Sequence, residues 1–526
     1  MPVPIQRHFL GWERPVVDLV AERLLEGAAG TPPDLGATLV MVQTRQGGRR
    51  LRERLAALSP RGLLSPRVVT PEFWLRPRGP VLSEIESLAV WAALLADVTP
   101  ADFPQALPGA EVRRDDSAWR LSVAGQFQQL RRLLSDGGHT VGSAAAQLAD
   151  GEEATRWQEL AALETLYLAR VEAAGAGRLD PVSAELAAAA APELPPGVAR
   201  LVLAAVPDPS PLALRAIAAL AGRLPIEVWI HAPAPGGAGN GTAGFDDWGR
   251  PDPAWQGREL PIEEARLHLA AKPHDQAATV RQMLPPLEVP VGELGLGVLD
   301  SEVGPHLLAE LGAEVPVFDP AERPLVGDPT AGLVQSLLLL HASDEYSAFS
   351  DLVRNPHFLT ALRGEVADFR PLLDGLDTLQ NESLAQSFTA IERAAQAGDG
   401  TGEDRAGARR KAVGAVCASV RRLLDPLGAD PTDALPGVLA SFYANAAFER
   451  PAAGGPPFFQ AAVDALLTLL DDVRAPLVRD CLPAPPDRSA LLLSTLARRG
   501  LAPEPPDNRP RIDLEGWLEL HWNDAP

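Results

Sequence analysis

The stretch ATLVMVQTRQGGRRLRERL, residues 37–55, determines the fold class of this chain. Residues 37–44 form an apolar run of the length and kind found in buried strands of parallel sheets. Residues 45–58 follow at once, and Leu51, Leu55 and Leu58 recur there at helical spacing. A buried strand that runs directly into an amphipathic helix predicts an α/β fold.

The same alternation returns further along the chain. A short strand is expected at 66–70, before PEFWL at 71–75, and a strand–helix–strand unit at 200–206, 211–220 and 225–230. A second series is expected to start with a strand at 265–271, followed by a helix at 275–284, a strand at 294–299, a helix at 304–311 and a strand near 315–318. Residues 82–191 and 332–496 carry helical periodicity throughout.

These patterns predict two parallel-sheet α/β cores, each with a mainly helical insertion, the second core being incomplete at the C-terminus. The predicted segments are the first core in two parts (1–80 and 192–260), its helical insertion (81–191), the start of the second core (261–325), its helical insertion (326–510) and a truncated return to the second core (511–526).

The charge composition excludes two kinds of catalytic site. The chain has 526 residues and a formal net charge of −22, and its only lysines are Lys272 and Lys411. Neither follows a glycine and precedes Ser or Thr, as the lysine of a phosphate-binding P-loop does. A PD-(D/E)XK nuclease needs a carboxylate two residues before its lysine, but Ala270 and Arg409 occupy those positions. We therefore expect neither an ATPase nor a nuclease site in this chain.

Cysteine content and the N-terminus indicate the compartment. Cys417 and Cys481 form no CxxC pair and no disulfide framework, which favours a reducing environment. The start MPVPIQRHFLGWERP lacks the layout of a signal peptide, and no apolar run is long enough to span a bilayer. A cytoplasmic protein without membrane contact is expected.

Residues 40–55, VMVQTRQGGRRLRERL, resemble the second motif of UvrD-like (superfamily I) helicases, and VVTPEFWL at 68–75 resembles the motif that follows it. LVLAAVPDPSPLALRAIAALA at 201–221 stands where that family has its acidic ATPase strand. The catalytic residues are absent, because 9–30 contains no GK[ST] and 206–209 reads VPDP in place of Asp-Glu. Asp208 alone is not assigned a metal. The chain thus resembles the inactivated helicase-like subunits of the AddB/RecC type, without their C-terminal PD-(D/E)XK nuclease domain.

The resemblance implies two RecA-like cores and a function without catalysis in this chain. It implies a subunit or fragment that binds single-stranded DNA in double-strand break repair and recombination, coupled to a PD-(D/E)XK exonuclease. The implied partners are single-stranded DNA and an active helicase–nuclease subunit of the AddA type. No cofactor is expected in this chain, since Mg²⁺ and an iron–sulfur cluster would belong to the C-terminal nuclease part of the family.

Two groups of residues are the candidates for binding DNA. Thr44, Arg45, Arg49 and Arg50 follow the first strand, where open α/β sheets bind ligands and where guanidinium groups suit phosphates. The alternative for the arginines is a solvated helix face paired with Glu53.

The second group follows the next strand along the chain and comprises Thr70, Phe73 and Trp74. An aromatic ring here could stack on a base. The alternative is that at least one of the two rings belongs to the core.

Two other interpretations of the chain stay open. The first is a dinucleotide-dependent enzyme, because GNGTAG at 239–244 matches the GxGxxG dinucleotide pattern. However, FDDWGRPDP follows this pattern in place of a helix. An α/β scaffold that binds a protein partner and no DNA is the second alternative, and the acidic net charge favours it.

The tail IDLEGWLELHWNDAP resembles the point where the AddB family re-enters its second core, with Gly516 and Glu519 matching a Gly–x–x–Glu element. We expect a longer or split polypeptide, in which a further segment covers an unpaired edge of the second sheet and carries the nuclease.

Overall fold

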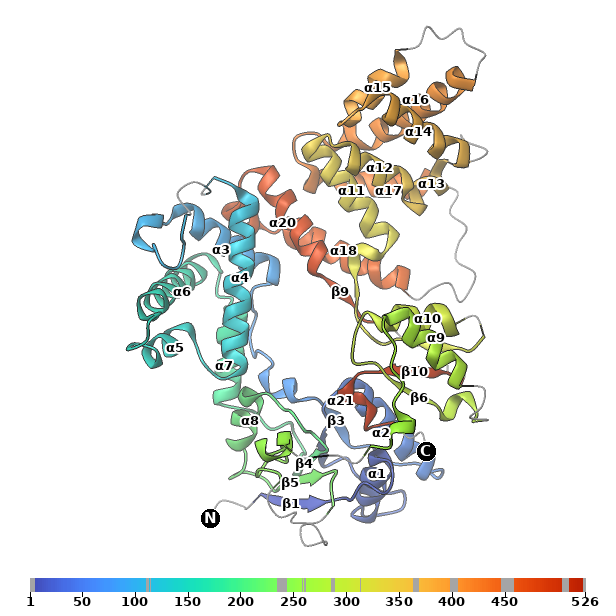
Figure 1. The fold of residues 1–526 in the computed structure, drawn as a ribbon. Helices are drawn as coiled ribbons and strands as arrows, with labels where there is room; N and C mark the ends of the chain where they lie inside the picture. Colours follow the sequence, from blue (N-terminus) through green and yellow to red (C-terminus); the bar gives the residue numbers. More distant parts are fainter. Residues whose placement is uncertain are drawn as a thin grey trace.

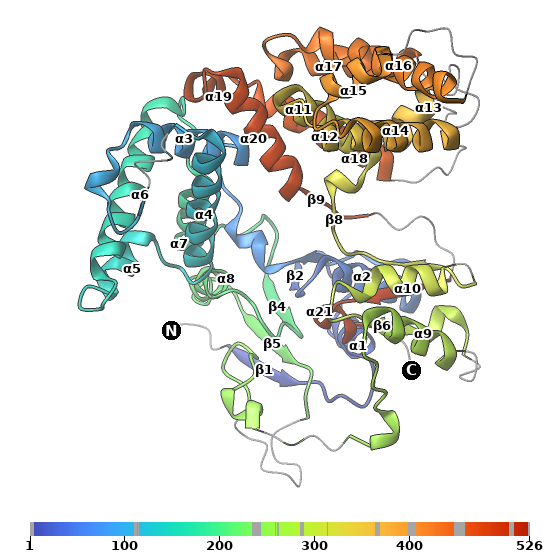
Figure 2. The same cartoon turned by 45° about the horizontal axis from the view of Figure 1, so that its top comes forward.

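The structure is a computed structural model that describes residues 5–109, 113, 115–233, 244–257, 259, 262–284, 289–312, 314–362, 369–397, 405–445, 458–503 and 510–523. A parallel sheet forms the base of the molecule (Figure 1). One helical group rises from this sheet, a second small sheet lies beside it, and a second helical group lies above both (Figures 1 and 2).

The first sheet has five parallel strands in the order β1-β5-β4-β2-β3. The strands are β1 (Gln6–Phe9), β2 (Thr38–Met41), β3 (Arg67–Val69), β4 (Arg200–Ala204) and β5 (Ile226–Ile230). Helices α1 (Val16–Glu26) and α2 (Arg45–Leu58) cover one face, while the 3-10 helix η1 (Pro71–Leu75) and α8 (Pro211–Ala218) cover the other.

Both faces of this sheet are apolar. Its central strands are continuous apolar runs, and successive side chains of a strand point to opposite faces. Leu39 and Met41 pack under η1 and α8, whereas Val40 packs under α1 and α2. The predicted strand and helix at 37–58 are confirmed, and α2 has the predicted bounds. Strand β1 was missed, because its sequence QRHF contains no apolar run and half of it is exposed.

The first helical group lies between β3 and β4 in the sequence. It contains α3 (Glu84–Asp97), α4 (Ser117–Asp136), α5 (Val141–Gln147), α6 (Ala154–Ala174) and α7 (Pro181–Ala190). Arg131 of α4 lies at its centre and donates two 2.8 Å hydrogen bonds to Asp180 and one of 2.8 Å to Glu164. A buried guanidinium with this many acceptors ties α4 to α6 and α7.

The second sheet has three parallel strands in the order β6-β10-β7. These are β6 (Gly295–Gly297), β7 (Val317–Phe318) and β10 (Ile512–Glu515). The central strand therefore comes from the tail of the described chain, about two hundred residues after its neighbours. Leu514 packs under α9 (Pro273–Met283) and α10 (Val303–Leu311), and the short helix α21 (Trp517–Leu520) follows β10.

The strand predicted at 265–271 was wrong. Residues Glu264–Arg266 form a 3-10 turn, and 267–271 are not in a strand. Leu267 is 57% exposed there, and Leu269 is fully exposed, at 102%. The alternating pattern of ARLHLAA is that of a strand, but no neighbouring strand pairs with it among the described residues. The alternating pattern by itself was therefore not enough to predict a strand in this segment.

The second helical group is joined to the second sheet by a two-stranded ribbon of β8 (Arg323–Pro324) and β9 (Gly500–Leu501). Its helices are α11 (Pro329–Ser343), α12 (Tyr346–Arg354), α13 (Pro356–Leu362), α14 (Phe369–Ser383), α15 (Phe388–Gln396), α16 (Arg405–Leu424), α17 (Pro431–Asn445), α18 (Phe458–Val473), α19 (Pro476–Cys481) and α20 (Pro485–Arg498). One continuous apolar core runs through both helical groups, joining side chains such as Trp91 of α3 and Leu491 of α20. The two insertions thus fold as one body.

Candidate nucleic-acid interface

The N-terminus of α2 lies at the carboxyl end of β2. Thr44 is the N-cap residue, and its hydroxyl oxygen accepts a 3.2 Å hydrogen bond from the Gly47 N–H. This cap fixes Arg45 as the first residue of the helix, where the peptide dipoles favour an anion. Within the described residues, the exposed Arg45 side chain makes no hydrogen bond or ion pair.

A cleft of about 660 Å³ opens at this end of the sheet, between β2, β3 and the helices α4 and α7. We call it the sheet-edge cleft. Three of the predicted DNA-binding residues line it, namely Thr44, Arg45 and Thr70. The other lining residues are Gln43, Glu72, Leu75, Arg76, Pro77, Arg132, Ser135, Asp136 and Glu185. The cleft thus gathers the ends of two adjacent strands and one face of the first helical group.

The charges of the cleft are mixed. Arg45, Arg76 and Arg132 bring three guanidinium groups, and Arg132 lies 3.9 Å from the carboxylate of Glu84. Glu72, Asp136 and Glu185 bring three carboxyl groups. Burial raises the pKa of Glu185 above its usual value, with a smaller contribution from neighbouring Asp136 and against the lowering effect of Arg132. Because of its raised pKa, Glu185 loses its negative charge at a higher pH than an ordinary glutamate does.

The two aromatic candidates have different environments. Trp74 is only 4% exposed and belongs to the apolar core under the sheet. Phe73 is partly buried, packs edge-on against Trp74 with ring centroids 5.1 Å apart, and lies 5.1 Å from the guanidinium carbon of Arg76. Of the two rings, the Phe73 ring is the more accessible to a ligand.

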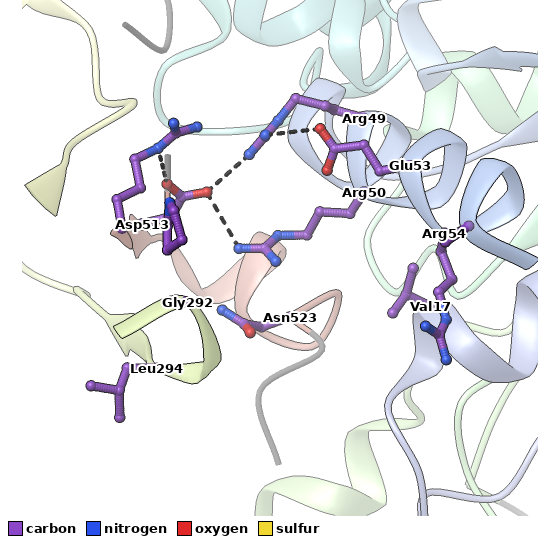
Figure 3. A pocket seen from close by; sticks show the side chains of 12 residues that line it. Val17, Arg49, Arg50, Glu53, Arg54, Gly292, Leu294, Asp513 and Asn523 are labelled. Carbon is purple, nitrogen blue, oxygen red and sulfur yellow. Dashed lines mark hydrogen bonds and ion pairs between the residues drawn. The ribbon is translucent and has the colours of Figure 1, made fainter. Parts of the chain in front are cut away.

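Arg49 and Arg50 lie on the other side of α2, at the junction with the second sheet (Figure 3). The Arg49 guanidinium donates to Asp513 at 2.9 Å and to Glu53 at 3.1 Å. Arg50 donates to Asp513 at 3.5 Å and also binds Glu515. These arginines therefore hold strand β10 against α2.

A second cavity, of about 480 Å³, lies at this junction and is called the interface pocket (Figure 3). Arg49, Arg50, Arg54 and Arg511 line it together with Glu53 and Asp513. Asp513 accepts from Arg511 as well, at 2.9 Å, so one carboxylate is shared by three guanidinium groups. Such shared pairing makes the arrangement a structural link between two folded units.

Glu515 is the most deeply placed acid of this junction, and its side chain is fully buried. Its oxygens accept hydrogen bonds from Gln46 at 3.2 Å, from Asn523 at 2.9 Å and from Arg50. Burial nevertheless raises the pKa of Glu515, and the opposing effect of Arg50 is smaller. The carboxylate is therefore held in place at a cost in desolvation.

The tail of the described chain packs against the first sheet near the carboxyl end of β4, the central strand. Trp522 is fully buried there against the apolar side chains of α1 and α2. A Cβ atom on Gly47 would lie 3.1 Å from the Trp522 ring, so a glycine at this position permits the close contact. The His521 ring lies 3.3 Å from the carbonyl oxygen of Ala205, which follows β4.

Several residues of the site were not predicted from the sequence. Arg76 and Arg132 reach the sheet-edge cleft from segments outside the helicase-like motifs. Asp513 and Glu515 alternate with Ile512 and Leu514 in the tail, and this alternation was the available signal for a strand with one polar face.

Two sequence observations lead to no site. Asp208 is exposed, and within the described residues only its backbone carbonyl accepts a hydrogen bond, from Gln43 at 3.1 Å. All of GNGTAG except Gly244 lies outside the described residues. In the part of the chain that the structure describes, no group of three His, Cys, Asp or Glu side chains could hold a metal ion.

Comparison of the chain with protein-family models and with curated proteins found no match. None of the helices in the described ranges combines the length and the apolar character that a bilayer span requires.

Proposed function

We propose that this chain is a non-catalytic, helicase-like protein that binds single-stranded DNA in the sheet-edge cleft. In this proposal it is a subunit or fragment that acts in double-strand break repair and recombination in the cytoplasm. It would be coupled to a PD-(D/E)XK exonuclease and would work beside an active helicase–nuclease subunit of the AddA type. Mg²⁺ and an iron–sulfur cluster would belong to the C-terminal nuclease part of the family.

One observation carries the proposal. The cleft gathers Thr44, Arg45 and Thr70 from two adjacent strand ends, and Arg132 adds a guanidinium group from the helical group opposite. Hydroxyl groups, guanidinium groups and the N–H groups of a helix N-terminus are the usual partners of DNA phosphates. Contacts of this kind hold the strand without reading its sequence.

The structure supports Arg45 over Arg49 and Arg50 as the main phosphate contact. Arg45 is exposed and, within the described ranges, makes no ion pair, whereas Arg49 and Arg50 are engaged by carboxylates of β10. Displacing those carboxylates would leave Glu515 buried without its charged partner, which is unfavourable.

The alternative is a protein-interaction scaffold without DNA binding. The net charge of −22 favours it, and so do Glu72, Asp136 and Glu185, which would repel phosphates in the same cleft. The three carboxyl groups equal the three guanidinium groups in number, so local geometry has to decide between the two functions.

Titration of the purified chain with a labelled single strand at two salt concentrations separates these functions. If three arginines contact phosphates, the logarithm of the binding constant should fall with the logarithm of salt concentration with a slope of about −2. A matched strand annealed to its complement is the control and should bind more weakly. Binding at background level in low salt would contradict the proposal and favour the scaffold.

A further inference from the structure

The segment that leads into α9 exposes a row of apolar side chains. Alternate positions from Ala265 to Ala271 are apolar, and they include Leu267 and Leu269. Every residue from 262 to 269 is nevertheless exposed, and the Leu269 side chain touches nothing that shields it from solvent. Neighbouring exposed leucines on one side of an extended chain are typical of a surface that another chain covers.

The backbone of this segment is extended and unpaired. Leu267 has φ −102° and ψ 117°, and Lys272 has φ −139° and ψ 158°, both in the extended region. Residues 268–271 make no backbone hydrogen bond to any other part of the described chain. A row of free N–H and C=O groups beside alternating apolar side chains is a template for a further strand.

The sequence of the segment is complementary to itself in the antiparallel direction. When two copies pair about His268, Leu267 of each copy faces Leu269 of the other, and Glu264 of each faces Lys272 of the other. Leucine pairs and pairs of opposite charge across two strands both stabilise a sheet. Glu264 and Lys272 are exposed, and within the described residues neither makes an ion pair.

Neighbouring registers match less well. Pairing about Leu269 would put Arg266 opposite Lys272, and two like charges that face each other are destabilising. Pairing about Leu267 would put Lys272 opposite Ile262 and so lose the charge pair. A slip by one residue would turn the leucines of the two copies to opposite faces. The side chains therefore favour the register about His268.

We propose that residues 264–272 are a dimerisation strand, which pairs antiparallel with the same residues of a second copy of this chain. The turn at Glu264–Arg266 opens on pairing. It gives up the 2.9 Å bond from the Arg266 N–H to the Glu263 carbonyl, the 3.0 Å bond from the Leu267 N–H to the Glu264 carbonyl, and an exposed ion pair between Arg266 and Glu263. Hydrogen bonds between the two strands replace these contacts.

The contact consists of two short strands, so the dimer is weak and depends on protein concentration. The dimerisation strand does not include any residue of the sheet-edge cleft. The inference is therefore independent of the proposed DNA binding, and either one can fail without the other.

Sedimentation velocity over a range of protein concentrations tests the dimer. The unmodified chain should show a monomer–dimer equilibrium, whereas Leu269→Lys should remain a monomer over the same range, because it puts a charge in each leucine pair. Leu133→Lys is the matched control, at a leucine of α4 that is 63% exposed, and should dimerise like the unmodified chain. Circular dichroism should show both variants folded, because both side chains are exposed.

Exchange of charges tests the register. Glu264→Lys and Lys272→Glu each put two like-charge pairs in the dimer, and each alone should weaken association about tenfold. An equimolar mixture of these two variants should form a mixed dimer about as tight as that of the unmodified chain, because opposite charges then face each other again. The double variant should likewise regain association.

Three results would overturn the proposal. The first is an unmodified chain that is monomeric at every concentration. The second is a dimer that Leu269→Lys leaves intact, since another surface would then form it. The third is a mixture of Glu264→Lys and Lys272→Glu that associates no better than either variant alone, which would exclude the antiparallel register about His268.

Discussion

The two parallel sheets of this chain are stabilised in different ways. The five-stranded sheet is apolar on both faces, with Leu203 on one and Val202 on the other. The three-stranded sheet is apolar only where Leu514 meets α9 and α10, and its other face presents Asp513 and Glu515 to α2. The first sheet therefore contains its own core, whereas the second depends on charge pairing with its neighbour.

The largest expected effect concerns the central leucine of each sheet. Leu203 and Leu514 are 1% and 2% exposed, but Leu514 lies in a much smaller apolar cluster. We expect Leu203→Ala to lower the free energy of unfolding by about 4 kcal/mol and Leu514→Ala by about 2 kcal/mol, because the smaller cluster can relax around the cavity. Urea denaturation of both variants measures this. Equal losses would contradict the difference between the sheets.

The next effect concerns the tail that joins the two sheets. Trp522 is fully buried against α2, whereas Trp517, five residues earlier, is 56% exposed. Trp522→Ala should cost about 3 kcal/mol of stability by opening a cavity at the end of β4. Trp517→Ala is the matched control and should change stability by no more than about 0.5 kcal/mol. If both variants melt like the unmodified chain, the tail does not hold the second sheet in place.

The charged junction gives an effect of similar or slightly smaller size. Arg50→Met leaves the buried Glu515 without its charged partner and should cost about 3 kcal/mol. Arg52, two residues further along α2, is exposed, and Arg52→Met should cost no more than about 0.5 kcal/mol. Thermal denaturation compares the two. A tolerated Arg50→Met would show that the ion pairs contribute little.

The smallest effect is a dependence on pH. Because burial raises the pKa of Glu515, folding favours its protonated form. The contribution of Glu515 to stability is therefore full below about pH 4.5, its unfolded value, and is lost as the pH rises through the raised pKa. As the pH rises from acid to neutral, Glu515→Gln should therefore become more stable relative to the unmodified chain. If Glu515→Gln instead lost stability relative to the unmodified chain as the pH rose, the effect of Arg50 on the Glu515 carboxylate would outweigh that of burial.

Sequence reasoning predicted the first sheet well because its strands are apolar runs followed directly by helices, as at 37–58. It failed at 265–271, where alternation continued without a neighbouring strand, and at β1, whose short, half-exposed sequence carries no apolar run. A local pattern indicates which side chains could be buried, but pairing between distant segments decides whether an alternating segment becomes a strand.

For the candidate site, the sequence placed Thr44, Arg45 and Thr70 correctly at strand ends, and these residues share one cleft. It could not separate Arg45 from Arg49 and Arg50, because Asp513 and Glu515, which engage the latter two, lie more than four hundred and fifty residues away along the chain. Nor could the sequence predict that Arg132 lines the cleft, since this depends on how α4 packs above the sheet (Figure 2).

The most direct test of the account compares the salt dependence of single-strand binding for Arg45→Ala and Arg49→Ala. Arg45 lies in the cleft and Arg49 lies at the junction of the two sheets. Arg45→Ala should weaken the binding of every sequence and reduce the salt slope by about one phosphate contact, whereas Arg49→Ala should leave the slope nearly unchanged. An unchanged slope in Arg45→Ala, in a folded protein that binds DNA, would contradict the central claim that the sheet-edge cleft holds the strand.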